Sequence, residues 1–124
     1  MRVWLLSIVL LAAPQQGPAL QPEPSVAGTY QITGEGPNGP YTGTAHIIQR
    51  GNAIAIRWSS TEGALAGFGV VDGSHVAAGY GLRDDYGAAV LYRITEVALV
   101  GTWADPSGVV HSETLTKTTE RVSQ

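Results

Sequence analysis

The side chains best suited to chemistry in this sequence are aromatic, and they recur at alternate positions of short segments. Six of them are expected on one common face: Tyr30, Tyr41, Trp58, Tyr80, Tyr92 and Trp103. Rings of this size bury roughly 150–250 Å² each, so together they can form a hydrophobic core. Their hydroxyl and indole groups also suit the wall of a pocket for a small apolar or aromatic ligand, and the many Gly and Ala residues on the same face leave space. Both interpretations stay open; the candidate lining residues are Tyr41, Trp58, Tyr80, Tyr92 and Trp103.

Glu113 is the acidic residue expected on the same face, in line with Leu115. A carboxylate that points inward needs hydrogen-bond partners. Tyrosine hydroxyls, an indole N–H or an arginine at the rim could provide them. Glu113 is therefore a candidate anchor that orients a bound ligand. The alternative is that its strand ends nearby and Glu113 lies at a solvated mouth.

Residues that could support catalysis or bind a metal are not grouped in the sequence. His46, His75 and His111 are not paired at two- or four-residue spacing, and there is no cysteine. No nucleophile stands at a useful spacing from a base. The glycines of 34–39 match G-x-G-x-x-G, but Pro40 follows where a dinucleotide site needs a helix. The adjacent Asp84 and Asp85 are typical of a solvated loop. We expect no enzyme activity, no metal and no cofactor.

The elements that must position these residues are short segments with a period of two, which is typical of half-buried strands. The clearest is the hairpin 41–58, whose two runs are separated by a turn at Gly51-Asn52. Segments rich in Gly, Pro or charge at 34–40, 59–63 and 81–87 are expected to be loops. The predicted strands are 28–33, 41–48, 53–58, 65–71, 75–80, 88–94, 97–103 and 109–117.

Eight short strands in sequence order favour an all-β fold, an antiparallel up-and-down meander barrel, because closure removes both sheet edges. A two-sheet β-sandwich is the alternative. The interior of an eight-stranded barrel can be filled by side chains or can hold one small ligand. The sequence leaves open whether the protein binds a ligand inside or is a structural domain with a filled core.

The presumed outer face carries more apolar residues than solvent exposure favours. Phe68 and Leu91, with their neighbours Ala66, Val70 and Ala89, would form an exposed patch that binds another protein or a second copy. A local bulge that turns Phe68 inward would explain the same residues.

The first part of the chain resembles an export signal. Residues 1–19 combine an N-terminal Arg2, an apolar run and small residues suited to cleavage after Ala19, with a second option after Ala27. A flexible lead is expected at 20–27, the barrel domain at 28–117 and a polar tail at 118–124. No later apolar run has the length of a membrane span, so we expect a periplasmic or secreted bacterial protein. The basic residues are scattered and the net charge is −3, which argues against nucleic-acid binding.

The order of the landmarks resembles a family of small exported bacterial proteins. They are GTYQITG, YTGTAHIIQRGNAIAIRW, GFGVVDGSHVAAGYG, YGAAVLYRI, LVGTW and a closing SETL, which together cover about 28–115. Some members of that family are labelled fibronectin-binding proteins, so the resemblance implies an extracellular protein partner. The meander is also similar to avidin-like and lipocalin-like barrels, although the biotin-contact pattern is missing.

Overall fold

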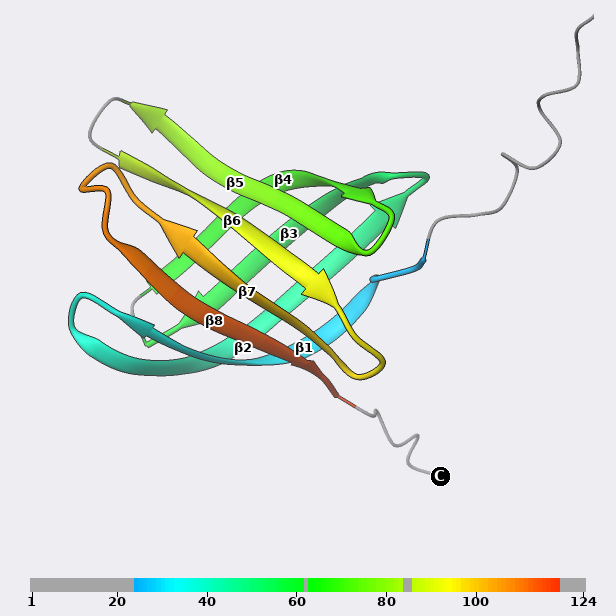
Figure 1. Cartoon of the computed structure of the whole chain (residues 1–124), viewed down its shortest axis with the longest axis horizontal. Coiled ribbons are helices and arrows are strands. Elements are labelled where there is room, and N and C mark those ends of the chain that lie inside the picture. Colours follow the sequence, from blue (N-terminus) through cyan, green and yellow to red (C-terminus); the bar gives the residue numbers. More distant parts are fainter. Residues whose placement is uncertain (1–23, 62, 84–85, 119–124) are drawn as a thin grey trace, which may run out of the picture.

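Eight antiparallel strands close into a barrel in the computed structural model, which describes residues 24–61, 63–83 and 86–118 (Figure 1). Each strand pairs with the next, and β1 pairs with β8. The strands are β1 (Gly28–Gly36), β2 (Gly39–Arg50), β3 (Ala53–Ser60), β4 (Gly63–Asp72), β5 (His75–Arg83), β6 (Tyr86–Ile94), β7 (Ala98–Ala104) and β8 (Val110–Lys117). The predicted barrel is confirmed, and the sandwich is not formed.

The hairpin of β2 and β3 has the predicted turn and faces. Gly51 adopts a φ of 59°, a conformation that glycine reaches without steric cost. Ile54, Ile56 and Trp58 of β3 point inward and are buried. Trp58 pairs with Ala45 across the ladder, so a small residue stands opposite the largest ring of the hairpin.

The strands run further than predicted at one end of the barrel. The loops expected at 34–40, 59–63 and 81–87 are wrong in extent, because β1 continues to Gly36 and β2 begins at Gly39. Similarly, β3 reaches Ser60 and β5 reaches Arg83. Glycine and proline weaken a strand locally, but here neighbouring strands continue the ladder, with Glu35 paired to Pro40. These extensions raise a wall around one mouth of the barrel.

Gly67 shows why β4 needs its glycines. A Cβ at this position would overlap the backbone carbonyl of Gly79 and lie 3.2 Å from Cζ3 of Trp58. The glycine therefore allows a close approach of β4 to β5 and leaves room for the Trp58 ring inside. Glycine inside a strand commonly marks such a close approach of backbone.

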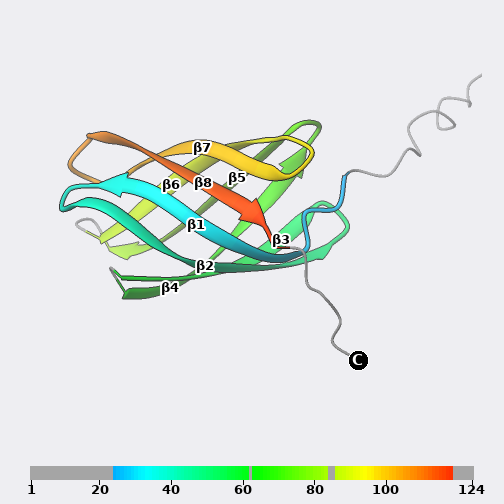
Figure 2. The same cartoon turned by 90° about the horizontal axis from the view of Figure 1, so that it is seen from below.

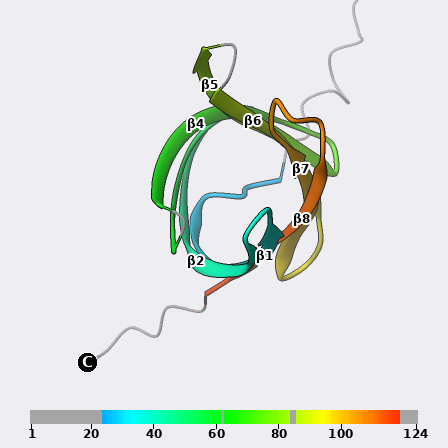
Figure 3. The same cartoon turned by 90° about the vertical axis from the view of Figure 1, so that its left-hand side faces the viewer.

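The end of the barrel that carries the β2–β3, β4–β5 and β6–β7 turns, called the closed end below, is filled by side chains. Its largest fully buried residues include Ile47, Val76, Leu99 and Leu115. The segment before β1, blue in Figure 3, crosses the barrel here and buries Val26, which is 1 % exposed. The Val26 N–H donates to Gln49 Oε1 at 2.7 Å, and the Val26 carbonyl accepts from the Tyr30 hydroxyl at 2.7 Å.

The flexible lead expected at 20–27 is therefore corrected at its end, where Val26 plugs the barrel instead of lying free. The predicted signal segment 1–19 and the Asp84–Asp85 pair lie outside the described residues, as does the tail from 119 to 124. Thr118, the first residue of the expected tail, donates from its N–H and its hydroxyl to the carbonyl of Thr29. Figure 2 shows that the coloured ribbon begins before β1 and ends after β8 at the closed end of the barrel.

Within the described part of the chain, no helix has the length and apolar character needed to cross a membrane.

Candidate functional site

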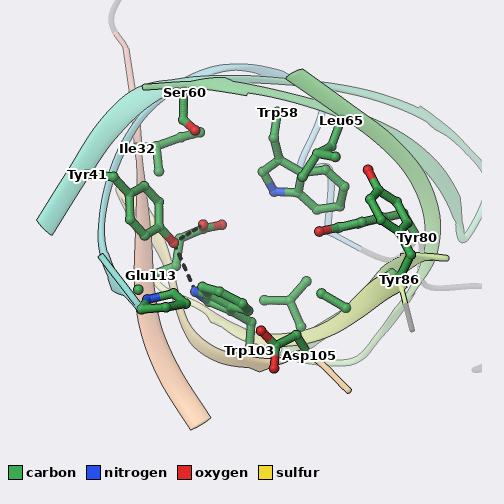
Figure 4. A pocket seen from close by; sticks show the side chains of 15 residues that line it. Ile32, Tyr41, Trp58, Ser60, Leu65, Tyr80, Tyr86, Trp103, Asp105 and Glu113 are labelled. Atoms are coloured by element: carbon green, nitrogen blue, oxygen red, sulfur yellow. Dashed lines mark hydrogen bonds between the residues drawn. The ribbon is translucent and has the colours of Figure 1, made fainter. Parts of the chain in front are cut away.

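The other end of the barrel, called the open end, holds a cavity of about 320 Å³ (Figure 4). Ligand pockets typically measure about 300–1,000 Å³, so this one suits a small molecule. Its wall is made mainly of aromatic and aliphatic side chains with two carboxylates. The lining residues are Ile32, Gly36, Pro37, Tyr41, Trp58, Ser60, Leu65, Gly79, Tyr80, Tyr86, Ala88, Val90, Trp103, Asp105 and Glu113.

Glu113 lies at the centre of a hydrogen-bond network that faces this cavity. The Tyr41 hydroxyl donates to its Oε1 at 2.6 Å, and the Tyr92 hydroxyl donates to its Oε2. Each hydroxyl in turn accepts from an indole: Trp103 Nε1 donates to Tyr41 at 2.9 Å and Trp58 Nε1 donates to Tyr92 at 3.1 Å. Two Trp–Tyr pairs thus converge on one carboxylate that is 7 % exposed.

The strand register explains how two tyrosines reach the same carboxylate. Tyr41 on β2 pairs with Gly34 on β1, which pairs with Glu113 on β8. On the other side Tyr92 on β6 pairs with Gly101 on β7, which also pairs with Glu113. A Cβ at Gly34 would lie 2.5 Å from the Tyr41 hydroxyl oxygen. Glycine on each intervening strand therefore leaves the path to Glu113 open.

The hydrogen bonds around Glu113 form one consistent pattern of donors and acceptors. Both oxygens of Glu113 accept, and both tyrosines use their single hydroxyl proton to donate. This arrangement fits an ionised carboxylate, which has acceptors only. Burial, reinforced by the charge and the hydrogen bond of Glu113, raises the pKa of Tyr92 well above its ordinary value. The phenol of Tyr92 therefore stays protonated and holds the carboxylate in place.

A corner of aromatic rings forms the wall opposite Glu113. The centroids of Trp58 and Tyr80 lie 5.9 Å apart with the rings tilted by 59°, and Tyr86 meets Tyr80 edge-on at 5.6 Å. The Trp103 ring also packs against the His111 ring, with their centroids 4.4 Å apart. Burial raises the pKa of the Tyr80 phenol, with smaller contributions from the nearby Tyr86, Asp105 and Glu113.

The predicted lining residues fall largely where the sequence placed them. Tyr41, Trp58, Tyr80, Trp103 and Glu113 line the cavity. Tyr92 does not line it but is fully buried and bonds to two residues that do. The solvated-mouth alternative for Glu113 is not what the structure has, since its carboxylate is buried and bonded at both oxygens. Trp58 contributes to the wall of the cavity and also packs on the core below it.

Several lining residues were missed by sequence reasoning, among them Leu65, Tyr86 and Asp105. Tyr86 and Asp105 were assigned to a loop and a turn, where no inward direction could be derived. The extension of β6 to Tyr86 brings that ring against Tyr80. Asp105 accepts from the N–H of Ser107 at 3.0 Å and from its hydroxyl at 2.5 Å, and these bonds lower the pKa of the Asp105 carboxyl.

The histidines do not form a joint site. His46 and His75 are exposed on the outside and bond to Thr29 and Ser74, respectively. His111 faces inward beside Trp103, and its Nε2 is buried without a hydrogen-bond partner. Among the described residues, no three His, Asp or Glu side chains come together as a metal site would require.

The apolar outer patch exists at the predicted place. Phe68 is 77 % exposed, and Val70 and Leu91 are also exposed. The register places Val70 and Leu91 on either side of Ala77, while Phe68 pairs with Gly79 in the neighbouring row. No bulge turns Phe68 inward.

Comparison with known proteins supports the fold. No protein-family model matches the chain, and a search of curated proteins finds no match. Among solved structures, the chain is similar to a redesigned β-barrel, with a TM-score of 0.61 and 14 % identity over 76 % of this chain and 92 % of that one. It is also similar to a de novo designed fluorescence-activating β-barrel, with a TM-score of 0.50 and 19 % identity over 74 % of this chain and 93 % of that one. At these identities the likeness concerns the architecture: an antiparallel β-barrel.

Proposed function

We propose that this protein is a non-enzymatic binding protein that holds a small aromatic or apolar molecule in the open end of its barrel. The observation that carries the proposal is the cavity of about 320 Å³ between the Glu113 network and the aromatic corner. A barrel with a filled core would place side chains there, as the closed end does. The de novo designed barrel of similar fold is described as fluorescence-activating, which is compatible with this use of the architecture.

The network supports binding because it keeps the cavity from collapsing. Trp58 and Trp103 are held by hydrogen bonds to Tyr92 and Tyr41, and Glu113 ties the two pairs together. Rings fixed in this way present a preformed apolar surface, and preorganisation lowers the entropy that binding would otherwise cost.

The test is the titration of the protein with a small neutral aromatic fluorophore such as N-phenyl-1-naphthylamine. Binding should raise the fluorescence of the probe and change the emission of the tryptophans. Ala88 lines the cavity, whereas its neighbour Ala89 faces outward and is exposed. We expect Ala88→Trp to abolish binding by filling the cavity and Ala89→Trp to retain it. Equal binding by the two variants, or none by the natural protein, would contradict the proposal.

A second candidate function is binding of a protein on the outer face, favoured by the exposure of Phe68 and its apolar neighbours. The family resemblance points to fibronectin as the partner to test. Binding to immobilised fibronectin should be lost in the double variant Phe68→Ser, Leu91→Ser and retained in Ala88→Trp. Unchanged binding in the double variant would exclude this face.

Export through the segment 1–19 belongs to the proposal. Expression in a bacterial host with a periplasm, followed by mass measurement of the recovered protein, should show cleavage after Ala19 or Ala27. Because Val26 plugs the closed end, cleavage after Ala27 would remove a core residue, so we expect cleavage after Ala19. Recovery of the uncleaved chain from the cytoplasm would contradict export.

A further inference from the structure

The charge inside the cavity points to a class of ligand. Two carboxylates, Glu113 and Asp105, contribute to its wall, and the lining residues in the described part of the chain include no Lys, Arg or His. Glu113 is buried, and its described partners are two neutral phenols. Hydrogen bonds satisfy such a carboxylate, but no positively charged side chain pairs with it among the described residues that line the cavity, whereas buried charges in proteins are usually paired.

The four donors that surround Glu113 are directed away from a ligand. The indole N–H groups of Trp58 and Trp103 are used on the tyrosines, and the hydroxyl protons of Tyr41 and Tyr92 are used on Glu113. An anionic ligand would have to break these bonds to be bound by the network, and it would also face two carboxylates. The network thus disfavours anions.

The aromatic corner suits a positive charge. The rings of Trp58, Tyr80 and Tyr86 meet at tilted or edge-on angles with centroids less than 6 Å apart, so their faces point in different directions around the cavity (Figure 4). The face of an aromatic ring is electronegative and attracts a cation within about 6 Å of its centroid. Such a corner, facing the Glu113 carboxylate, provides both kinds of attraction that an organic cation uses.

We infer that the ligand of this cavity is a small organic ammonium ion carried on a planar or apolar body. The ammonium group lies toward Glu113, and the body packs on Trp58, Tyr80 and Trp103. Asp105 at the rim adds a second negative charge that favours entry of cations. This inference rests on the proposed function, since it names the ligand that the proposed cavity takes.

The experiment compares three ligands of nearly equal size by calorimetry: 1-naphthylmethylammonium, 1-naphthylmethanol and 1-naphthoate. The natural protein should bind the ammonium compound about tenfold tighter than the alcohol or more, because attraction between the ammonium and the Glu113 carboxylate in a partly desolvated site supplies at least a factor of this order. The naphthoate should bind more weakly than the alcohol. Equal binding of all three, or tighter binding of the naphthoate, would overturn the inference and leave the proposed function intact. If none of them bound, both would fall.

Variants assign the preference to Glu113. Glu113→Gln should bind the ammonium compound and the alcohol with affinities within about threefold of each other. Glu96→Gln removes the same charge at the exposed β6–β7 turn of the closed end and should keep the tenfold preference. A preference that survives in Glu113→Gln would overturn the role of this residue. The comparison of the three ligands in the natural protein needs no variant, so it decides the inference even if Glu113→Gln folds poorly.

Discussion

The Tyr41 hydroxyl donates to Glu113 at 2.6 Å although a whole strand, β1, lies between their strands. This contact joins β2 to β8, near the two ends of the chain, and therefore exists only because the barrel closes between β1 and β8. The same carboxylate holds Tyr92 of β6. Glu113 thus connects strands on both sides of the β1–β8 pairing. The cavity beside Glu113 depends on that pairing.

Gly34 is the position where this relationship is most easily broken. A Cβ there would overlap the Tyr41 ring and lie 2.9 Å from the carbonyl oxygen of Ser112. Gly34→Ala should displace Tyr41 from Glu113 and lower the free energy of unfolding by about 1–3 kcal/mol. Gly36→Ala is the matched control, because its Cβ would meet atoms only at 3.4 Å or beyond. Urea unfolding of the two variants checks the prediction, and equal stability would contradict it.

The two tyrosines of the network should differ in their contribution to stability. Tyr92→Phe leaves Trp58 Nε1 without its acceptor and Glu113 Oε2 without its donor at a fully buried position. Unpaired buried polar groups cost about 1–3 kcal/mol each, so we expect a loss of about 2–4 kcal/mol. Tyr41→Phe removes equivalent bonds beside the cavity, where water can replace them, and should cost about 1 kcal/mol.

Urea unfolding measures both variants, with Tyr86→Phe as the exposed control that should stay within about 0.5 kcal/mol of the natural protein. A smaller loss for Tyr92→Phe than for Tyr41→Phe would show that burial does not control the cost.

The architecture and most of the site could be predicted from the sequence because strands have a strict period of two. In a strand around Trp58, the alternation of side chains between the two faces is enough to place Trp58 inward and Arg57 outward. The same alternation placed Glu113 inside, but not its two tyrosine partners, since strand pairing depends on register. That register becomes visible only when β1 meets β8.

The missed residues Tyr86 and Asp105 lie outside the predicted strands, where the alternation of inward and outward side chains could not be applied. Tyr86 follows a glycine-rich, charged segment that local rules assign to a loop, and its inward position depends on the pairing of β5 with β6, which includes a register shift near Gly81. The sequence also could not predict that this end of the barrel is hollow. It depends on how far the strands continue past their predicted ends, as β5 does to Arg83.

The raised pKa of Tyr92 predicts a loss of stability in alkali. Below about pH 10 the phenol is protonated in both states and its contribution is constant. Above that pH the unfolded chain releases the proton while the folded chain retains it, because burial and Glu113 raise the pKa in the fold. Unfolding is then favoured increasingly until the folded pKa is passed.

The free energy of unfolding should therefore fall as the pH rises above about 10, and it should fall less in Tyr92→Phe. Tyr30 and Tyr80, whose pKa values burial also raises, contribute in the same direction and remain in the variant. Urea unfolding at several pH values gives both curves. Parallel curves for the two proteins would mean that Tyr92 is not responsible.

Substitutions in the apolar outer patch should affect stability much less than substitutions in the core. Leu91 is about half-exposed on β6, whereas the preceding Val90 is buried inside. Leu91→Ser should therefore change the free energy of unfolding by about 0.5 kcal/mol or less. Val90→Ser should cost about 2 kcal/mol or more, because it removes buried methyl groups and introduces a hydroxyl. Thermal or urea unfolding distinguishes the two variants. A large loss for Leu91→Ser would mean that this face is covered in solution, by a second copy of the chain, and would make stability depend on protein concentration.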